Sequence, residues 1–107
     1  MTDEAADRWA LTLYVNGSSP NSVQAIETVR RVCDEDLRGH VDLEVIDVRR
    51  QPALAARDQI VATPTLIKRL PGPPRRIVGD LSDAAQLRLR LELGSPAAVD
   101  GRPDRDA

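Results

Sequence analysis

Residues 81–94 read LSDAAQLRLRLELG, and two structural periods compete within this one stretch. The opening LSDAA favours a helix, because Ser82 is a good N-cap and Asp83 suits the positive end of a helix dipole. The following QLRLRLEL alternates polar and apolar residues without interruption, which is the pattern of a half-buried strand. The choice between helix and strand at this segment decides the fold.

The leucines of this segment are arranged differently in the two structures. A helix places Leu87 and Leu91 on one face and puts Leu89 and Leu93 on nearly the opposite face. A strand with period 2 gathers all four leucines on one side of a sheet. The residues alone leave both structures open.

Composition excludes several functional classes. The 107 residues form one domain, and a net charge of −2 gives no electrostatic reason to bind nucleic acid. Trp9 and Tyr14 are the only aromatic residues, so no base-stacking platform is expected. The polar N-terminus lacks a signal peptide, and no apolar run approaches the ~18 residues needed to span a bilayer. We therefore expect a cytoplasmic protein that binds neither nucleic acid nor membrane.

Cys33 is the only cysteine and His40 the only histidine. One cysteine cannot form an intramolecular disulfide, and this pair is too small for a Cys/His metal site. Cys33 also fits a helical apolar stripe with Val23, Ile26, Val29 and Leu37, which explains it as a core residue. We expect no catalytic residue, no metal site and no cofactor.

The rest of the chain predicts an α/β domain between two polar ends. The expected elements are a strand at 10–15, a helix from 20 to about 37, a strand at 41–48, a short helix within 49–61, and strands at 63–70 and 75–80. Ser19 and Pro20 mark the start of the long helix, and the first two strands flank it as a parallel βαβ unit. We expect disorder at 1–8 and 95–107 and a folded domain at 9–94.

With a helix at its end, this order matches a thioredoxin-like sheet, β-α-β-α-β-β-α. VATPTL at 61–66 supports the match, because thioredoxin-like domains place such a proline, often cis, beside their active site. Redox members carry CxxC before the first helix, where this chain reads NGSSPNS. A redox or glutathione-dependent enzyme would have to use Ser18, Ser19 or Ser22, and no base is visible beside them.

Three stretches together resemble the KaiB family of clock proteins. They are LTLYVNGSSPNS, LEVIDVRRQPALAARDQIVATPTL and LPGPPRRIVGDLS, with their spacing, within residues 10–93. The resemblance implies a non-enzymatic regulator that binds the N-terminal ATPase ring of a KaiC-type hexamer, dependent on the nucleotide state. An adaptor related to stress, with no KaiC partner, is the alternative.

The resemblance also implies two folds. In a ground-state fold, a dimer or tetramer, residues 87–93 form a strand; in the thioredoxin-like monomer they form a helix, and this form binds KaiC. Two folds of similar free energy need a sequence compatible with both. The residues implied in the slow switch are Thr63, Pro64, Pro71, Gly72, Pro73, Pro74, Leu87, Leu89, Arg90, Leu91, Leu93 and Gly94.

Two departures from the family pattern matter. Arg90 stands where relatives commonly have glycine, and arginine is the better helix former, so we expect the thioredoxin-like state to be favoured. Asp42 and Glu44 stand where cyanobacterial relatives tend to have Ala and Lys on the surface that captures KaiA. KaiA binding is therefore not expected.

The resemblance places the KaiC contact on the second short helix and its approach. The residues implied are Gln51, Ala55, Arg57, Asp58 and Gln59, with Lys68 and Arg69 nearby. Charged residues on such a surface mainly set orientation and association rate.

Overall fold

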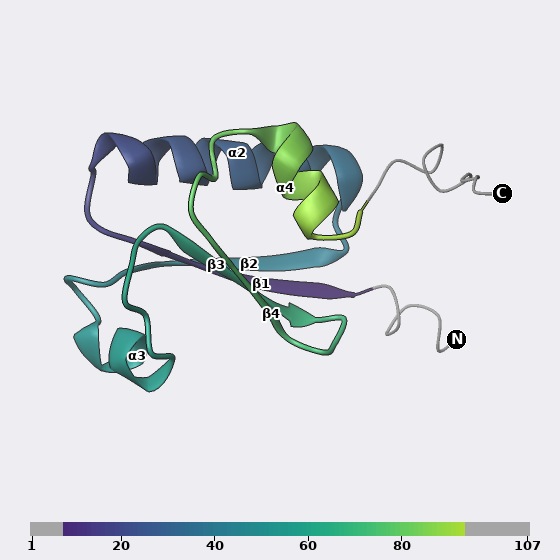
Figure 1. Cartoon of the computed structure of the whole chain (residues 1–107). Helices are drawn as coiled ribbons and strands as arrows, with labels where there is room; N and C mark the ends of the chain where they lie inside the picture. The colour runs from purple at the N-terminus through teal and green to yellow at the C-terminus, as the bar shows by residue number, and fades with distance from the viewer. Residues whose placement is uncertain (1–7, 94–107) are drawn as a thin grey trace, which may run out of the picture.

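The computed structural model describes residues 8–93, which form a four-stranded sheet with helices on both faces (Figure 1). The elements are β1 (Trp9–Val15), α2 (Pro20–Asp36), β2 (Val41–Asp47), α3 (Pro52–Arg57), β3 (Thr65–Leu70), β4 (Arg75–Val78) and α4 (Ala84–Arg90). The segments expected to be disordered lie outside the described residues, apart from Arg8, and so does Gly94.

The sheet has the strand order β2-β1-β3-β4. β1 pairs with β2 in parallel, with α2 as the crossover, while the β1–β3 and β3–β4 pairs are antiparallel. The thioredoxin-like order expected from the sequence is therefore confirmed. The peptide bond between Thr63 and Pro64 is cis, as are the bonds preceding Pro71 and Pro73.

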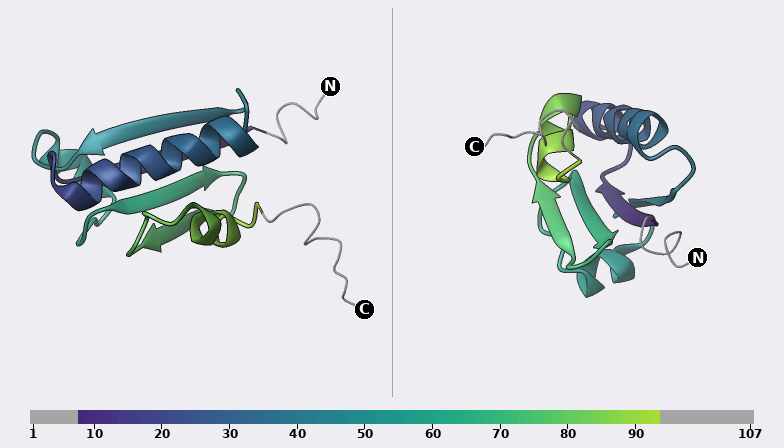
Figure 2. Two further views of the ribbon diagram at one scale, coloured as in Figure 1. Left: turned by 90° about the horizontal axis from the view of Figure 1, so that it is seen from above. Right: turned by 90° about the vertical axis from the view of Figure 1, so that its right-hand side faces the viewer.

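Helices α2 and α4 cover one face of the sheet and α3 covers part of the other (Figure 2). The main core lies beneath α2 and α4 and consists of Leu11, Leu13, Val15, Ala25, Val29, Val32, Cys33, Leu37, Leu66, Ile77, Leu81, Leu87 and Leu91. None of the three helices within residues 8–93 has the length and apolar character needed to cross a bilayer.

Helix α2 begins as expected, but its buried stripe is rotated from the predicted one. Ser19 is the N-cap and Pro20 the first helical residue. Ser22 turns inward and accepts hydrogen bonds from the Asn16 amide and the Ser19 hydroxyl, at 2.9 and 3.0 Å. Because Ser22 faces the sheet, Val23 is exposed and Ile26 is only half-buried. The buried helix residues are Ser22, Ala25, Thr28, Val29, Val32 and Cys33.

The segment with two competing periods forms the helix α4. Its N-cap is Asp83, whose Oδ1 accepts from the amides of Ala85 and Gln86 at 2.9 and 3.2 Å. The prediction of Ser82 as the cap was wrong, because the Ser82 amide and hydroxyl both donate to Asp80 in the preceding turn.

The leucines of α4 follow the helical period. Leu87 and Leu91 are each 1% exposed and pack in the main core, whereas Leu89 is 63% exposed. Leu93, just beyond the helix, is half-buried against the same core. Only the face of α4 that carries Leu87 and Leu91 packs against the core, and Leu89 on the other face remains in solvent.

The end of α4 is a Schellman motif with a glutamate at its left-handed position. Glu92 has a φ of 62°, its amide donates to the Leu89 carbonyl at 3.0 Å, and the Leu93 amide donates to the Arg88 carbonyl at 2.9 Å. Glycine is the usual residue there because it has no Cβ to strain. The helix is closed, but with a residue that does not favour this backbone conformation.

Two arginines connect the end of α4 to the edge strand β4. Arg75 donates to the Arg90 carbonyl at 2.8 Å and forms an ion pair with Glu92 at 3.0 Å. Arg90 in turn donates to the Val78 carbonyl at 3.3 Å. These reciprocal contacts hold α4 beside β4 in the observed arrangement.

The helical period can be tested with three leucines. We expect Leu87→Ala and Leu91→Ala each to lower the free energy of unfolding by about 2–4 kcal/mol, because each leaves a cavity in the core. Leu89→Ala should change it by about 0.5 kcal/mol or less, because that side chain is in solvent. Urea unfolding followed by circular dichroism measures all three. Equal losses at the three positions would indicate the strand instead.

Candidate partner-binding surface

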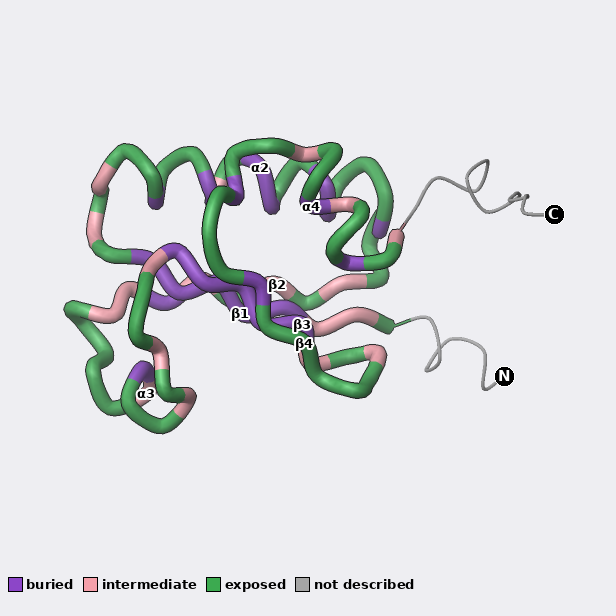
Figure 3. The backbone as a smooth tube through the Cα atoms, in the orientation of Figure 1, coloured by how far each residue is buried: buried purple, intermediate pink, exposed green. Residues whose placement is uncertain are grey.

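Helix α3 lies on the face of the sheet opposite α2 and α4, over a small core of its own (Figures 1 and 2). That core consists of Tyr14, Ile46, Ala55 and Ile67, with Val48, Leu54 and Ile60 packed against it. The outer side of α3 and the chain around it are mostly exposed (Figure 3). This exposed side is the surface on which a partner contact is expected from the family resemblance.

The helix is short and closed by its backbone. Pro52 is its first residue, and the preceding Gln51 makes no side-chain cap. Gln59 follows the C-terminus with a φ of 56°, and the Ile60 amide donates to the Ala55 carbonyl at 2.9 Å. With the bond from the Gln59 amide to the Ala56 carbonyl at 3.0 Å, this is a second Schellman motif.

The carboxylate of Asp58 ties α3 to the centre of the sheet. It accepts a short hydrogen bond from the Tyr14 hydroxyl of β1, and Arg69 of β3 donates to it at 2.8 Å. The Nε of Arg69 also donates to the hydroxyl of Thr12 at 2.9 Å. Residues from two strands therefore meet on one carboxylate at the end of α3.

A third strand holds the same helix end through its carbonyls. Arg76 of β4 donates to the carbonyl of Asp58 at 2.7 Å and to that of Gln59 at 3.2 Å. Terminal carbonyls of a helix otherwise lack intrahelical partners, so Arg76 satisfies groups that α3 leaves open. Neither Tyr14 nor Arg76 could be predicted from the sequence as a support of α3. The sequence signal for these two residues is weak, because each is a single polar residue in a strand whose other positions alternate between the two faces of the sheet.

These contacts change the ionisation of the two central groups. Hydrogen bonds from Tyr14 and then from Arg69 lower the pKa of Asp58, so its carboxylate stays ionised at neutral pH. Burial, followed by the hydrogen bond to Asp58, raises the pKa of the Tyr14 hydroxyl, which therefore remains a donor. The two groups stabilise each other in the states that this hydrogen bond requires.

The structure brings together some of the residues expected on the surface and separates others. Gln51, Arg57 and Gln59 are exposed around α3, and Arg69 and Asp58 are half-buried beside them. Ala55 faces the small core.

Lys68 lies apart from this group. It is 6% exposed and, as the strand neighbour of Arg69, points to the other face of the sheet, where its Nζ lies 5.5 Å from the centre of the Trp9 ring. Ala55 and Lys68 thus have packing roles in this arrangement.

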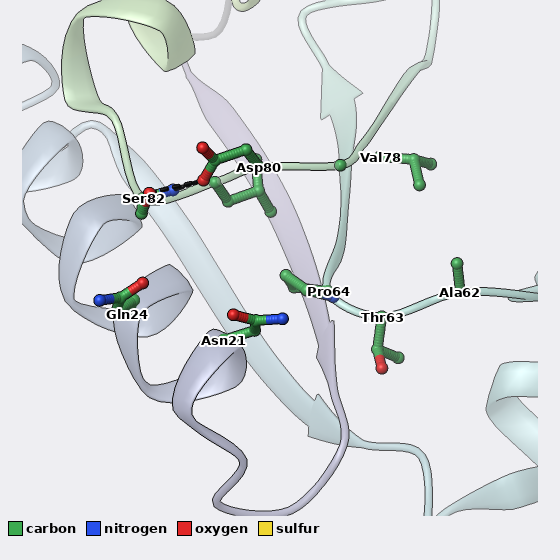
Figure 4. Close-up of a pocket in the computed structure, with 10 residues that line it drawn as sticks. Asn21, Gln24, Ala62, Thr63, Pro64, Val78, Asp80 and Ser82 are labelled. Carbon is green, nitrogen blue, oxygen red and sulfur yellow. Dashed lines mark hydrogen bonds between the residues drawn. The ribbon is translucent and has the colours of Figure 1, made fainter.

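A cavity of about 500 Å³ lies between the start of α2 and the segment that joins β4 to α4, beside the cis proline Pro64 (Figure 4). It is lined by Asn21, Gln24, Ala62, Thr63, Pro64, Val78, Gly79, Asp80, Leu81 and Ser82. The side chains of Asn21 and Gln24 lie across from Asp80 and Ser82, which are bonded to each other. These amide, hydroxyl and carboxylate groups include no thiol and no histidine. Within residues 8–93, no cluster of three or more His, Cys, Asp or Glu side chains is arranged for a metal.

Cys33 is also unsuited to thiol chemistry. It is buried in α2, and burial, followed by the nearby charge of Asp34, raises its pKa to about 11. The reactive species in disulfide exchange is the thiolate, which this environment disfavours. The interpretation of Cys33 as a core residue agrees with its position.

The sequence of this chain is similar to that of known proteins of one family. The family model of the KaiB domain matches residues 12–93. The circadian clock oscillator protein KaiB of Prochlorococcus marinus (strain MIT 9312) is 48% identical over 89 residues, which are 83% of this chain and 85% of that protein. KaiB of Microcystis aeruginosa is 48% identical over 85 residues, 79% of this chain and 82% of that protein.

Solved structures give the same fold. The N-terminal domain of SasA from Synechococcus elongatus superposes with a TM-score of 0.63 at 29% identity, covering 90% of this chain and 88% of that chain. Chloroplastic thioredoxin z superposes with a TM-score of 0.68 at 22% identity, covering 86% and 83%. The thioredoxin likeness concerns the fold alone.

The role of Asp58 can be tested by removing its charge. We expect Asp58→Asn to lower the free energy of unfolding at pH 7 by about 1–2 kcal/mol, because the charged bonds from Tyr14 and Arg69 weaken. Since the folded pKa of Asp58 is lowered, its contribution is present above the ordinary aspartate pKa of about 4 and is lost as pH falls through the folded value. Wild type and variant should therefore converge in acid.

Urea unfolding at pH 7 and at about pH 3 measures this convergence. Asp42→Asn is the matched control, because among residues 8–93 Asp42 pairs only with Arg8, on the exposed part of the same face. We expect the control to lose less stability at pH 7. An Asp58→Asn variant as stable as wild type at pH 7 would contradict the role given to this carboxylate.

Proposed function

The chain belongs to the KaiB family, and from this premise we propose that it is a non-enzymatic clock regulator that docks on the ATPase ring of a KaiC-type hexamer. The observation that carries the proposal is the assembly of α3 by the strands beneath it. Its end is held by Tyr14 of β1, Arg69 of β3 and Arg76 of β4. The expected contact residues Gln51, Arg57, Asp58, Gln59 and Arg69 lie around that helix.

We propose that the docking surface exists only in the thioredoxin-like arrangement. Arg69 and Arg76 belong to the half of the chain, from about Thr63 onward, that the family resemblance assigns to the fold switch. If β3 and β4 leave their places, the bonds to Asp58 and to the last carbonyls of α3 are lost. Fold and binding would then be linked through named contacts and not only through overall shape.

Gating by a minor state has a calculable effect. If about 1% of molecules are competent, the apparent affinity falls about 100-fold, or about 2.7 kcal/mol. In the structure α4 is helical, and Arg90 donates to the Val78 carbonyl. Both features support an equilibrium that favours the monomer competent to bind. A dimer or tetramer would belong to the alternative arrangement, with Leu87, Leu89 and Leu91 on one strand face.

Two further parts of the proposal concern KaiA and the location in the cell. Asp42 and Glu44 are exposed on the edge strand β2, and Asp42 is paired with Arg8 at 2.8 Å. Acidic residues at these positions support a regulator that acts without KaiA. We also propose a cytoplasmic location, where a KaiC-type ATPase would be met.

Docking can be tested by size-exclusion chromatography with a purified KaiC-type hexamer in ADP and in ATP. We expect the chain to co-elute with the hexamer in one nucleotide state and to elute separately in the other. Gln59→Glu should weaken co-elution, since it adds negative charge beside α3 without a change of shape. Gln24→Glu, the same change at an exposed position of α2 on the other face of the sheet, serves as control. Separate elution in both nucleotides would refute the docking proposal.

The balance between arrangements can be shifted in both directions at the end of α4. Glu92→Gly should favour the helical arrangement by about 0.5–1 kcal/mol, because glycine accepts the positive φ and weakens a strand. Arg90→Gly should disfavour it by about 1 kcal/mol through helix propensity and the lost bond to Val78. Leucine methyl NMR and light scattering would report the populations. Identical populations in both variants and wild type would argue against two accessible arrangements.

A further inference from the structure

A small, shallow hollow lined mainly by aliphatic residues opens beside α3, on the chain that leads to β3. It has a volume of about 190 Å³ and is lined by Val48, Ile60, Val61, Ala62 and Thr63. Val48 and Ile60 form its inner wall, because both pack against the core beneath α3. Val61 is 95% exposed, the most exposed large apolar side chain of the described residues. Val61 lines the hollow together with Val48 and Ile60, and exposed apolar side chains that lie together are a feature of interaction sites.

The charged groups that face solvent around the hollow are positive. The acidic residues nearby are engaged inward: Asp58 with Tyr14 and Arg69, and Asp47 with the amides of Gly17 and Arg49. Bonds from the Arg49 and Gly17 amides also lower the pKa of Asp47.

The neighbouring arginines are left with little compensation. Arg50 and Arg57 are exposed, and the nearest carboxylate oxygen to Arg57 is 3.9 Å away. Arg50 and Arg76 form no ion pair with any residue between 8 and 93. Arg76 donates its hydrogen bonds to backbone carbonyls, which do not neutralise its positive charge.

We propose that this hollow is the anchor point of the docking surface and receives one aliphatic side chain that the partner presents between carboxylates. An apolar centre with charged groups at its rim is the usual anatomy of a protein interface, with the energy concentrated at the centre. The hollow holds a single branched side chain, and the arginines select the acidic flanks. This inference rests on the proposed function for the identity of the partner, while the chemistry of the hollow is independent of it.

A peptide probe tests the hollow without any partner protein. The acetylated, amidated pentapeptide EELEE is titrated into the full chain by amide NMR, with EESEE as its matched control. We expect EELEE to shift the amides of residues 48 and 60–63 and to bind about tenfold tighter than EESEE, because burial of the leucine is lost in the control. No shifts at these residues, or equal binding of both peptides, would overturn the proposal.

Variants of the chain separate the apolar and the charged contributions. Val61→Ser should weaken EELEE binding about tenfold, and the double variant Arg50→Glu/Arg57→Glu should weaken it similarly and reduce its salt dependence. The matched controls are Val23→Ser and Arg30→Glu, the same changes at exposed positions of α2 on the other side of the sheet. All five positions are exposed, so circular dichroism should show unchanged folding. Equal effects at the control positions would also count against the hollow.

The same variants are then tested on a purified KaiC-type hexamer. If wild type binds the hexamer, Val61→Ser should lower affinity about tenfold while Val23→Ser leaves it unchanged. Wild-type binding that Val61→Ser does not weaken would overturn the hollow as anchor and leave the proposed function standing. Failure of wild type to bind would instead refute the proposed function, and the peptide titration would still decide the hollow.

Discussion

The carboxylate of Asp58 is the point at which the helix α3 depends on the rest of the molecule. A six-residue helix has too few internal hydrogen bonds to persist by itself, so its position must come from tertiary contacts. A tyrosine of β1 and an arginine of β3 meet on this carboxylate, while an arginine of β4 takes the carbonyls beside it. The sheet order β2-β1-β3-β4 is what brings these three side chains to one place. The surface around α3 is therefore a product of long-range strand pairing.

Helix α4 departs from an optimal helix in two respects. It leaves Leu89 in solvent, and it ends on Glu92 in a conformation that favours glycine. Each departure costs stability in this arrangement, and each is harmless or useful in a strand, where alternating leucines pack together. Both departures lie in the segment 81–94, where the choice between helix and strand decides the fold. Local imperfection is what a sequence must accept if it is to fit two packings.

Patterns of short period could be predicted from the sequence, and contacts across the sheet could not. Hydrophobic alternation and the signals of Ser19 and Pro20 were enough for the strands, for the start of α2 and for the thioredoxin-like order. The cap of α4 was missed because Ser82 and Asp83 are both good caps, and a bond from Asp80 decides between them. The contact between Tyr14 and Asp58 joins residues 44 positions apart, and no local pattern encodes it. Hence the surface could be placed on α3, but its supports could not.

The burial of Cys33 makes the chain its own reporter of opening. The thiol belongs to α2 and lies within the main core, in the half of the molecule that both proposed arrangements share. A bulky thiol reagent can reach it only when this core opens, either because α2 leaves the sheet or because β3, β4 and α4 leave α2. The labelling rate therefore measures how often the core opens. A single natural sulfur atom thus reports this opening with no engineered probe.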